Sequence, residues 1–166
     1  LVMDLIKKGK ISNDGMKHLF LVDPFVVPSD KLLTLIGLVG PMLGYLETPM
    51  TPAEEGHYYH FRPQETLQQL VNIMEKTRKD LQEGFNLPAG VRMKIYKSIK
   101  DPTADAVSAV LICKGLKNSD GTNIDVEMID SELHVLTRLN GREGISQHDK
   151  DNQKHVFDDM YKILVP

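Results

Sequence analysis

The sequence predicts an α+β fold in which an antiparallel β-sheet packs against one long α-helix, with further helices beside it. Between residues 17 and 61, short apolar or aromatic runs alternate with proline-containing breaks, a pattern typical of strands joined by turns. From residue 64 to residue 83 the period becomes helical, with apolar residues three and four apart. Nearer the carboxyl end, alternating runs at 124–129 and 133–136 flank the turn-like pair Asp130-Ser131 and predict a hairpin.

The front part of the chain, residues 11–62, is predicted to be β-rich. Strands are expected at 18–22, at 25–27 and in the aromatic run 57–61, because prolines fix φ and remove backbone donors between them. The apolar run 32–39 is either a strand or a buried helical segment, since periodicity alone does not distinguish the two.

One long amphipathic helix is predicted after this β-rich part. Pro63 stands at its entrance, where a missing amide costs least, and Gly84 stands where a carboxyl-terminal cap belongs. The stripe predicted to face the core consists of Leu67, Leu70, Val71, Ile73, Met74, Thr77 and Leu81.

The remaining elements are a strand and two helices. Residues 91–99 predict a strand that places Met93, Ile95 and Lys97 on the face opposite Arg92, Lys94 and Tyr96. Asp101 is the predicted N-cap of the next helix, with Pro102 in its first turn. A last helix is predicted with Val156, Phe157, Met160, Ile163 and Leu164 turned inward.

Composition indicates one domain, residues 1–166, with a β-rich front (11–62) and a helix-containing remainder (63–166), cut from a larger polypeptide. The 166 residues are 41% hydrophobic, enough to form a core without disulfide bonds or bound metal ions. A single cysteine excludes an internal disulfide, and the net charge of −3 disfavours indiscriminate nucleic-acid binding. No apolar run approaches the roughly 20 residues that span a bilayer, so no membrane partner is expected.

Motifs for catalysis are absent from the sequence. It contains no G-x-x-x-x-G-K loop, no H-E-x-x-H and no G-x-S-x-G elbow. His57 and His60 are three apart, which on a strand means opposite faces, so a metal pair is not expected. His148 with Asp149 and Asp151 could form an acid–base group, but the favoured interpretation is a solvated polar loop before a helix. The sequence therefore predicts no enzyme, no cofactor and no metal.

The order of these elements resembles a known viral domain. The features are Ile11-Ser12 after a short helix, the Glu55-Gly56 turn with aromatics, the helix containing residues 106–112, the run 132–138, and the final helix with Gln153-Lys154. Together they resemble the middle, cap-binding domain of the second polymerase basic protein of influenza-type viruses, in a distant thogotovirus-like relative. The resemblance implies a mixed fold that holds the 7-methylguanosine cap of host messenger RNA during cap snatching.

In that family the methylated base lies between two aromatic rings, while an acidic side chain and a lysine fix its edge. The resemblance places Glu54 and Leu116 at the ring positions and Tyr58 or Tyr59 at the position of the acid. Only the lysine is retained, as Lys76. Glu54 and Leu116 therefore predict a degenerate pocket.

Two functions follow as alternatives. The first is a non-catalytic module of a viral RNA polymerase in which cap binding is lost or weakened. The second is a working cap-binding module that uses the local cluster His57, Tyr58 and Tyr59 together with Lys76. A third and less favoured class is an unrelated small α/β enzyme, which no motif supports. The expected partners are the other polymerase subunits, acidic and catalytic, with RNA as a further candidate. The expected location is the virion and the host nucleus.

Overall fold

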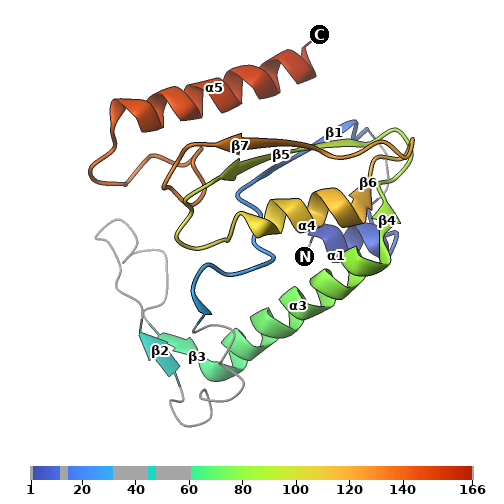
Figure 1. The fold of residues 1–166 in the computed structure, drawn as a ribbon, viewed down its shortest axis with the longest axis horizontal. Helices are drawn as coiled ribbons and strands as arrows, with labels where there is room; N and C mark the ends of the chain where they lie inside the picture. The colour runs from blue at the N-terminus through green and yellow to red at the C-terminus, as the bar shows by residue number, and fades with distance from the viewer. Residues whose placement is uncertain (1, 12–14, 32–44, 48–60, 166) are drawn as a thin grey trace.

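The computed structural model describes residues 2–11, 15–31, 45–47 and 61–165. Figure 1 shows a sheet with helices on both of its faces. The elements in chain order are α1 (Val2–Lys7), β1 (His18–Val22), β2 (Tyr45–Glu47), β3 (Phe61–Pro63), α3 (Gln64–Glu83), β4 (Phe85–Asn86), β5 (Arg92–Ser98), α4 (Val107–Gly115), β6 (Leu116–Lys117), β7 (Asp125–Ile129) and α5 (Gln147–Leu164).

The main sheet is parallel, not antiparallel as predicted. Its order is β1-β5-β7, with Leu19 opposite Met93 and Tyr96 opposite Glu127. Parallel neighbours need crossover connections, which α3 and α4 supply. The predicted hairpin is therefore wrong, because β7 pairs with β5 and residues 134–137 form a turn. Two small additional pairs are β2 with β3, antiparallel, and β4 with β6, parallel.

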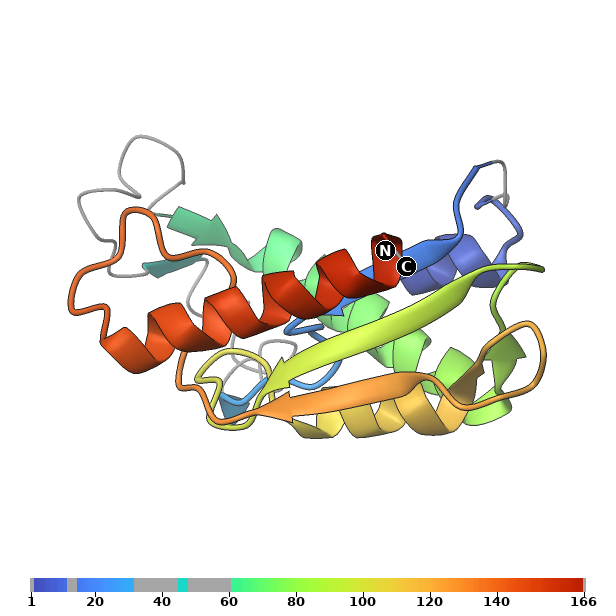
Figure 2. The same cartoon turned by 90° about the horizontal axis from the view of Figure 1, so that it is seen from above.

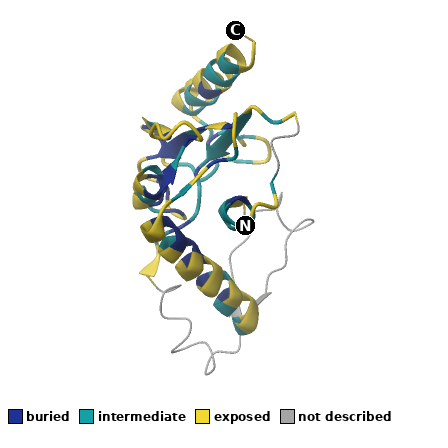
Figure 3. Cartoon of the chain, turned by 90° about the vertical axis from the view of Figure 1, so that its right-hand side faces the viewer, coloured by how far each residue is buried: buried dark blue, intermediate teal, exposed yellow. Residues whose placement is uncertain are grey.

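Helices cover both faces of this sheet. Helix α5 crosses one face, while α4 and α1 lie on the other, with α3 beyond them (Figures 1 and 2). The alternation predicted for β5 is confirmed, since Met93 and Ile95 belong to the core on the α4 side and Tyr96 to the core under α5. Figure 3 shows the buried residues concentrated on the sheet and on the helix faces turned toward it. None of the helices in the described ranges combines the length and apolar character needed to cross a membrane.

The long helix has the predicted bounds, Gln64–Glu83, but different neighbours. It packs mainly against α4 instead of the sheet, and Ile73 is 47% exposed, so the prediction that Ile73 is buried is wrong. The buried stripe of α3 is narrower than predicted, because the helix packed against it presents a smaller face than a sheet does. The helices approach closely where a Cβ at Gly115 would lie 2.0 Å from the Leu81 carbonyl oxygen.

Other boundary predictions divide between confirmed and corrected. The strand at 18–22 is confirmed, whereas no strand forms at 25–27, where residues 26 and 27 are in bends. Helix α4 begins at Val107, so Asp101 is not its N-cap. In α5, Val156 is buried as predicted but Phe157 and Leu164 are exposed. The runs at 32–39 and 57–60 lie outside the described residues.

Candidate acid–base site at the carboxyl ends of the strands

Three polar side chains gather at one edge of the main sheet. Asp23 directly follows β1, Asp101 comes shortly after β5, and His134 comes after β7. Because these strands are parallel neighbours, their carboxyl ends meet at a single edge. Sites in open α/β sheets form at this edge, where loops rather than regular backbone supply the side chains.

The centre of the site is a histidine–carboxylate pair. The Nδ1 atom of His134 lies 2.9 Å from the Oδ2 atom of Asp101. The Asp101 side chain is fully buried, while 31% of the His134 side chain is exposed. A buried carboxylate on Nδ1 fixes that nitrogen as the proton donor and leaves Nε2 as a base. The arrangement can therefore accept a proton on the exposed side of the imidazole.

Asp101 is held by further donors. Its Oδ1 atom accepts hydrogen bonds from the backbone amides of Thr103 (2.8 Å) and Ala104 (3.0 Å). Its Oδ2 atom also accepts one from Lys97 Nζ at 2.6 Å. Burial acts to raise the pKa of Asp101, but the hydrogen bonds from Lys97, His134 and the two amides hold that pKa below its usual range. Asp101 is therefore an ionised, immobile partner for the imidazole.

Asp23 joins the end of β1 to the loop that carries His134. Its Oδ1 atom accepts from Ser98 N (2.7 Å) and Lys97 Nζ (3.1 Å), and its Oδ2 atom accepts from the amide of Leu136 (3.1 Å). Asp23 itself has a φ of 48°, and Val135, directly after the histidine, has a φ of 55°. A β-branched residue with positive φ is strained, and such strain concentrates at functional sites.

The histidine loop has two further supports. An Nη2 donor of Arg142 hydrogen-bonds to the backbone carbonyl of His134, and Ser131 Oγ accepts from the amide of Leu133. A cavity of about 370 Å³ opens beside this loop at the same end of the sheet. Its lining comprises Lys100, Asp130, Ser131, Glu132, Leu133, Gly144, Ser146, His148 and Asp149.

Within the described residues, no serine hydroxyl and no cysteine thiol hydrogen-bonds to His134. Ser98 donates to Asp23, and Ser29 donates to the backbone carbonyl of Asp101. The Cys113 thiol donates to the carbonyl of Ile124, on the α4 side of the sheet. The described site thus supplies a base and its orienting acid without a nucleophile.

The site residues predicted from the resemblance lie elsewhere. Lys76, on α3, pairs with Asp4 and Asp80 at 2.7 Å each, so it ties α1 to α3. Leu116 is fully buried in the core. Glu54, His57, Tyr58 and Tyr59 lie outside the described residues.

The polar group near the start of α5 is a helix cap. Asp149 and Ser146 form a capping box, and His148 Nε2 contacts the backbone carbonyl of Asp130 at 2.7 Å. These residues begin a helix instead of forming a loop before it. Their side chains are occupied by the capping box and by the contact with Asp130, so they form no acid–base group.

Comparisons with known proteins bear on the fold. No family model and no curated protein matches the sequence. Among solved structures, the chain is similar to one described for LipS and LipT, two metagenome-derived lipolytic enzymes (TM-score 0.61, 11% identity, 97% of this chain and 60% of that one). It is also similar to mouse alpha/beta hydrolase domain-containing protein 10 (TM-score 0.53, 14% identity, 97% of this chain and 56% of that one). A third similar structure is a putative hydrolase of Agrobacterium vitis S4 (TM-score 0.56, 15% identity, 95% of this chain and 56% of that one).

These similarities show an α/β-hydrolase-like fold, and the chain spans less than two thirds of each of the three structures. The predicted cap-binding fold, the viral polymerase function in both its forms and the thogotovirus-like origin are therefore wrong. The prediction of a domain that is itself non-catalytic is contradicted as well, since the three similar structures are described as hydrolases or lipolytic enzymes.

The order of elements in the sequence does contain an indication of the Asp101–His134 pair. Asp101 follows an apolar strand and His134 follows the next strand along the chain, with helix α4 between them. A strand–helix–strand order favours a parallel sheet, which would bring both residues to one edge.

Proposed function

We propose that this chain carries the acid–base half of a hydrolase active site that cleaves carboxylic esters. The observation that carries the proposal is the 2.9 Å contact between His134 Nδ1 and Asp101 Oδ2. The two residues follow neighbouring parallel strands in the chain order acid, then histidine. This order is the one that α/β hydrolases use for the last two members of their triad.

The proposed chemistry follows from the geometry of the pair. His134 Nε2 takes the proton of a nucleophilic hydroxyl as its oxygen attacks the acyl carbon, and the imidazolium then protonates the departing alkoxide. A water molecule, deprotonated by the same nitrogen, hydrolyses the acyl–enzyme. Asp101 stabilises the imidazolium throughout and stays ionised, in keeping with its lowered pKa.

The nucleophile comes from outside the described residues in this proposal, because none of the described serines or cysteines hydrogen-bonds to His134. In α/β hydrolases it precedes the acid along the chain, on a sharp strand-to-helix turn. An ester substrate is favoured because one structural neighbour is described as lipolytic.

The test is hydrolysis of p-nitrophenyl esters with short to long acyl chains by the purified protein. His134→Ala should lower kcat/KM by about 10³-fold or more, and Asp101→Asn should lower it by about 10²–10⁴-fold. His155→Gln is the matched control, since His155 also contacts a carboxylate, that of Glu127, but on the α5 face. This control should keep near wild-type activity.

Labelling with a fluorophosphonate, followed by peptide mapping, identifies the nucleophile. Labelling that depends on His134 supports the proposal. An active enzyme that is unaffected by His134→Ala, or a protein that neither cleaves any ester nor takes up the label, contradicts it.

A further inference from the structure

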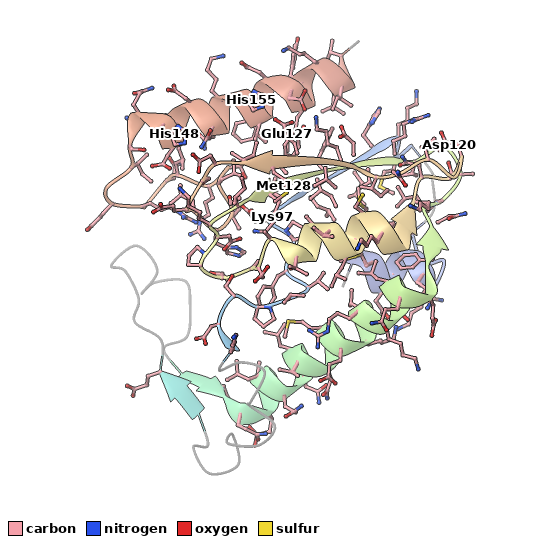
Figure 4. The ribbon with its side chains drawn as sticks, in the orientation of Figure 1. Lys97, Asp120, Glu127, Met128, His148 and His155 are labelled. Carbon is pink, nitrogen blue, oxygen red and sulfur yellow. The ribbon has the colours of Figure 1, made fainter. Side chains whose placement is uncertain are left out.

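A buried lysine stands beside the histidine–carboxylate pair. The side chain of Lys97 has no exposed surface and lies between the carboxylates of Asp23 and Asp101, which are also fully enclosed. Figure 4 places it on the side of the sheet that faces α4. Lysine is almost never fully buried, and the loss of its hydration is costly, so an apolar residue would serve packing better here.

Lys97 and His134 share one oxygen atom. Lys97 Nζ lies 2.6 Å from Asp101 Oδ2, the atom that His134 Nδ1 contacts at 2.9 Å. The two nitrogens are therefore within two hydrogen-bond lengths of each other, without solvent on the lysine side. At such a separation in a buried site, one charge strongly changes the cost of creating another.

The charges of the cluster determine how it responds to a proton. Asp23 and Asp101 each carry one negative charge, and Lys97 carries one positive charge. With neutral His134 the cluster has a net charge of −1, and protonation of the imidazole makes it neutral. Without Lys97 the same carboxylates would carry −2 and would hold the imidazole proton much more firmly.

The other charged groups near His134 lie closer to solvent. Arg142 meets its backbone carbonyl, and Lys100 pairs with Asp130 at 3.2 Å and with Glu132 at 3.7 Å on the surface. His148 contacts the carbonyl of Asp130 from α5. Exposed charges are screened by water and salt, so Lys97 and Asp23 dominate the buried side.

We propose that Lys97 and Asp23 form a charge-setting pair that holds Asp101 in place and sets how readily His134 takes up a proton: Lys97 opposes protonation of the imidazole, and Asp23 favours it. This inference rests on the proposed function for its catalytic meaning, but its physical content is a property of the folded protein alone. Lys97 is a positioning residue that acts on His134 through Asp101. Asp23 has a second task, since it also anchors the Leu136 amide in the histidine loop.

The test follows the titration of the His134 ring protons by NMR in the whole protein. Lys97→Met removes the positive charge and should move the midpoint of the His134 titration upward by about 1–3 pH units. Asp23→Asn removes one negative charge at a positive φ that asparagine tolerates, and should move the midpoint downward. Lys94→Met is the matched control, because Lys94 lies on the same strand but under α5, and should leave the midpoint nearly unchanged.

Shifts in opposite directions for the two site variants, with the control unmoved, support the proposal. Shifts in one direction, or no shift, overturn it, since a merely structural role does not depend on the sign of the charge removed. If Lys97→Met does not fold, the direction of the Asp23→Asn shift decides. In the active enzyme the acid limb of kcat/KM should move with the same signs.

The two proposals fail separately. A protein without esterase activity but with opposite shifts would contradict the proposed function and leave the charge-setting pair standing. An active enzyme in which neither variant moves the midpoint of the His134 titration would contradict the charge-setting pair and leave the proposed function standing.

Discussion

The two lysines of β5, Lys94 and Lys97, have similar chemistry and opposite surroundings. Lys94 Nζ meets the carboxylates of Asp159 at 2.6 Å, Glu127 at 3.1 Å and Asp125 at 3.4 Å, under α5. It also lies 5.2 Å from the centre of the Tyr96 ring. Lys97 meets Asp23 and Asp101 on the other face, at the end of the strand.

The difference between them lies in access to water. The Lys94 side chain is 15% exposed and Asp125 is 67% exposed, whereas Lys97 and both of its partners are fully buried. Figure 4 shows Glu127 and His155 on the α5 side of the sheet and Lys97 on the α4 side. Ion pairs that reach water can rearrange, and they serve here to attach a helix. Ion pairs sealed from water fix charges, which suits a site that must position a base.

The largest expected effect is on stability. Lys97→Met should lower the free energy of unfolding by about 3–5 kcal/mol, because two buried carboxylates lose their partner. Lys94→Met should cost about 1–2 kcal/mol, since its carboxylates are partly solvated. Urea unfolding of both variants at neutral pH measures the difference. Equal losses would show that burial does not separate the two lysines.

An intermediate effect should appear in alkali, on the α5 face. Burial and the nearby Asp159 raise the pKa of Tyr96. Burial acts to lower the pKa of Lys94, but the Asp159 and Glu127 carboxylates outweigh it and raise that pKa. Both groups bind their protons more tightly when folded, so their stabilisation is complete below their ordinary values near 10 and is lost as pH rises above them. Each should contribute a loss of about 1.4 kcal/mol per pH unit there.

Tyr96→Phe sharpens this expectation. It removes the hydrogen bond to Asp159 (2.7 Å), at a cost of about 1–2 kcal/mol at neutral pH. It should also flatten the fall in stability between about pH 10 and 11, measured by urea unfolding. An unchanged slope would mean that Tyr96 titrates alike in the folded and unfolded states.

The smallest effect is expected at the surface of the same face. His155 contacts Glu127, but 56% of its side chain is exposed. His155→Gln should therefore change the unfolding free energy by about 0.5 kcal/mol or less. Thermal unfolding compared at neutral pH would measure it. A loss of stability comparable to that of Lys94→Met would show that His155 contributes as much as Lys94 to the attachment of α5.

Elements with strong local patterns were predictable from the sequence. The bounds of α3, the strand β1 and the two faces of β5 were predicted correctly, because periodicity is a property of neighbouring residues. Ile73 shows the limit of such patterns. It falls on the apolar side of α3, yet it is exposed because the partner of α3 is another helix instead of a sheet.

The site itself was not predictable in the same way. An aspartate followed by proline is as typical of a helix N-cap as of a site residue. Asp101 does accept amide hydrogen bonds from Thr103 and Ala104, as an N-cap would. Nothing local to it indicates His134, which lies 33 residues further along the chain.

The sequence by itself determined the bounds of α3, the strand β1 and the two faces of β5, since those properties depend on spacing along the chain. Only the tertiary structure decided that β1, β5 and β7 run parallel, because parallel pairing joins distant segments through crossovers and leaves no turn motif between paired strands. That pairing brings Asp23, Lys97, Asp101 and His134 together. Their burial, which fixes the charges around the imidazole, is a consequence of packing and not of any local pattern.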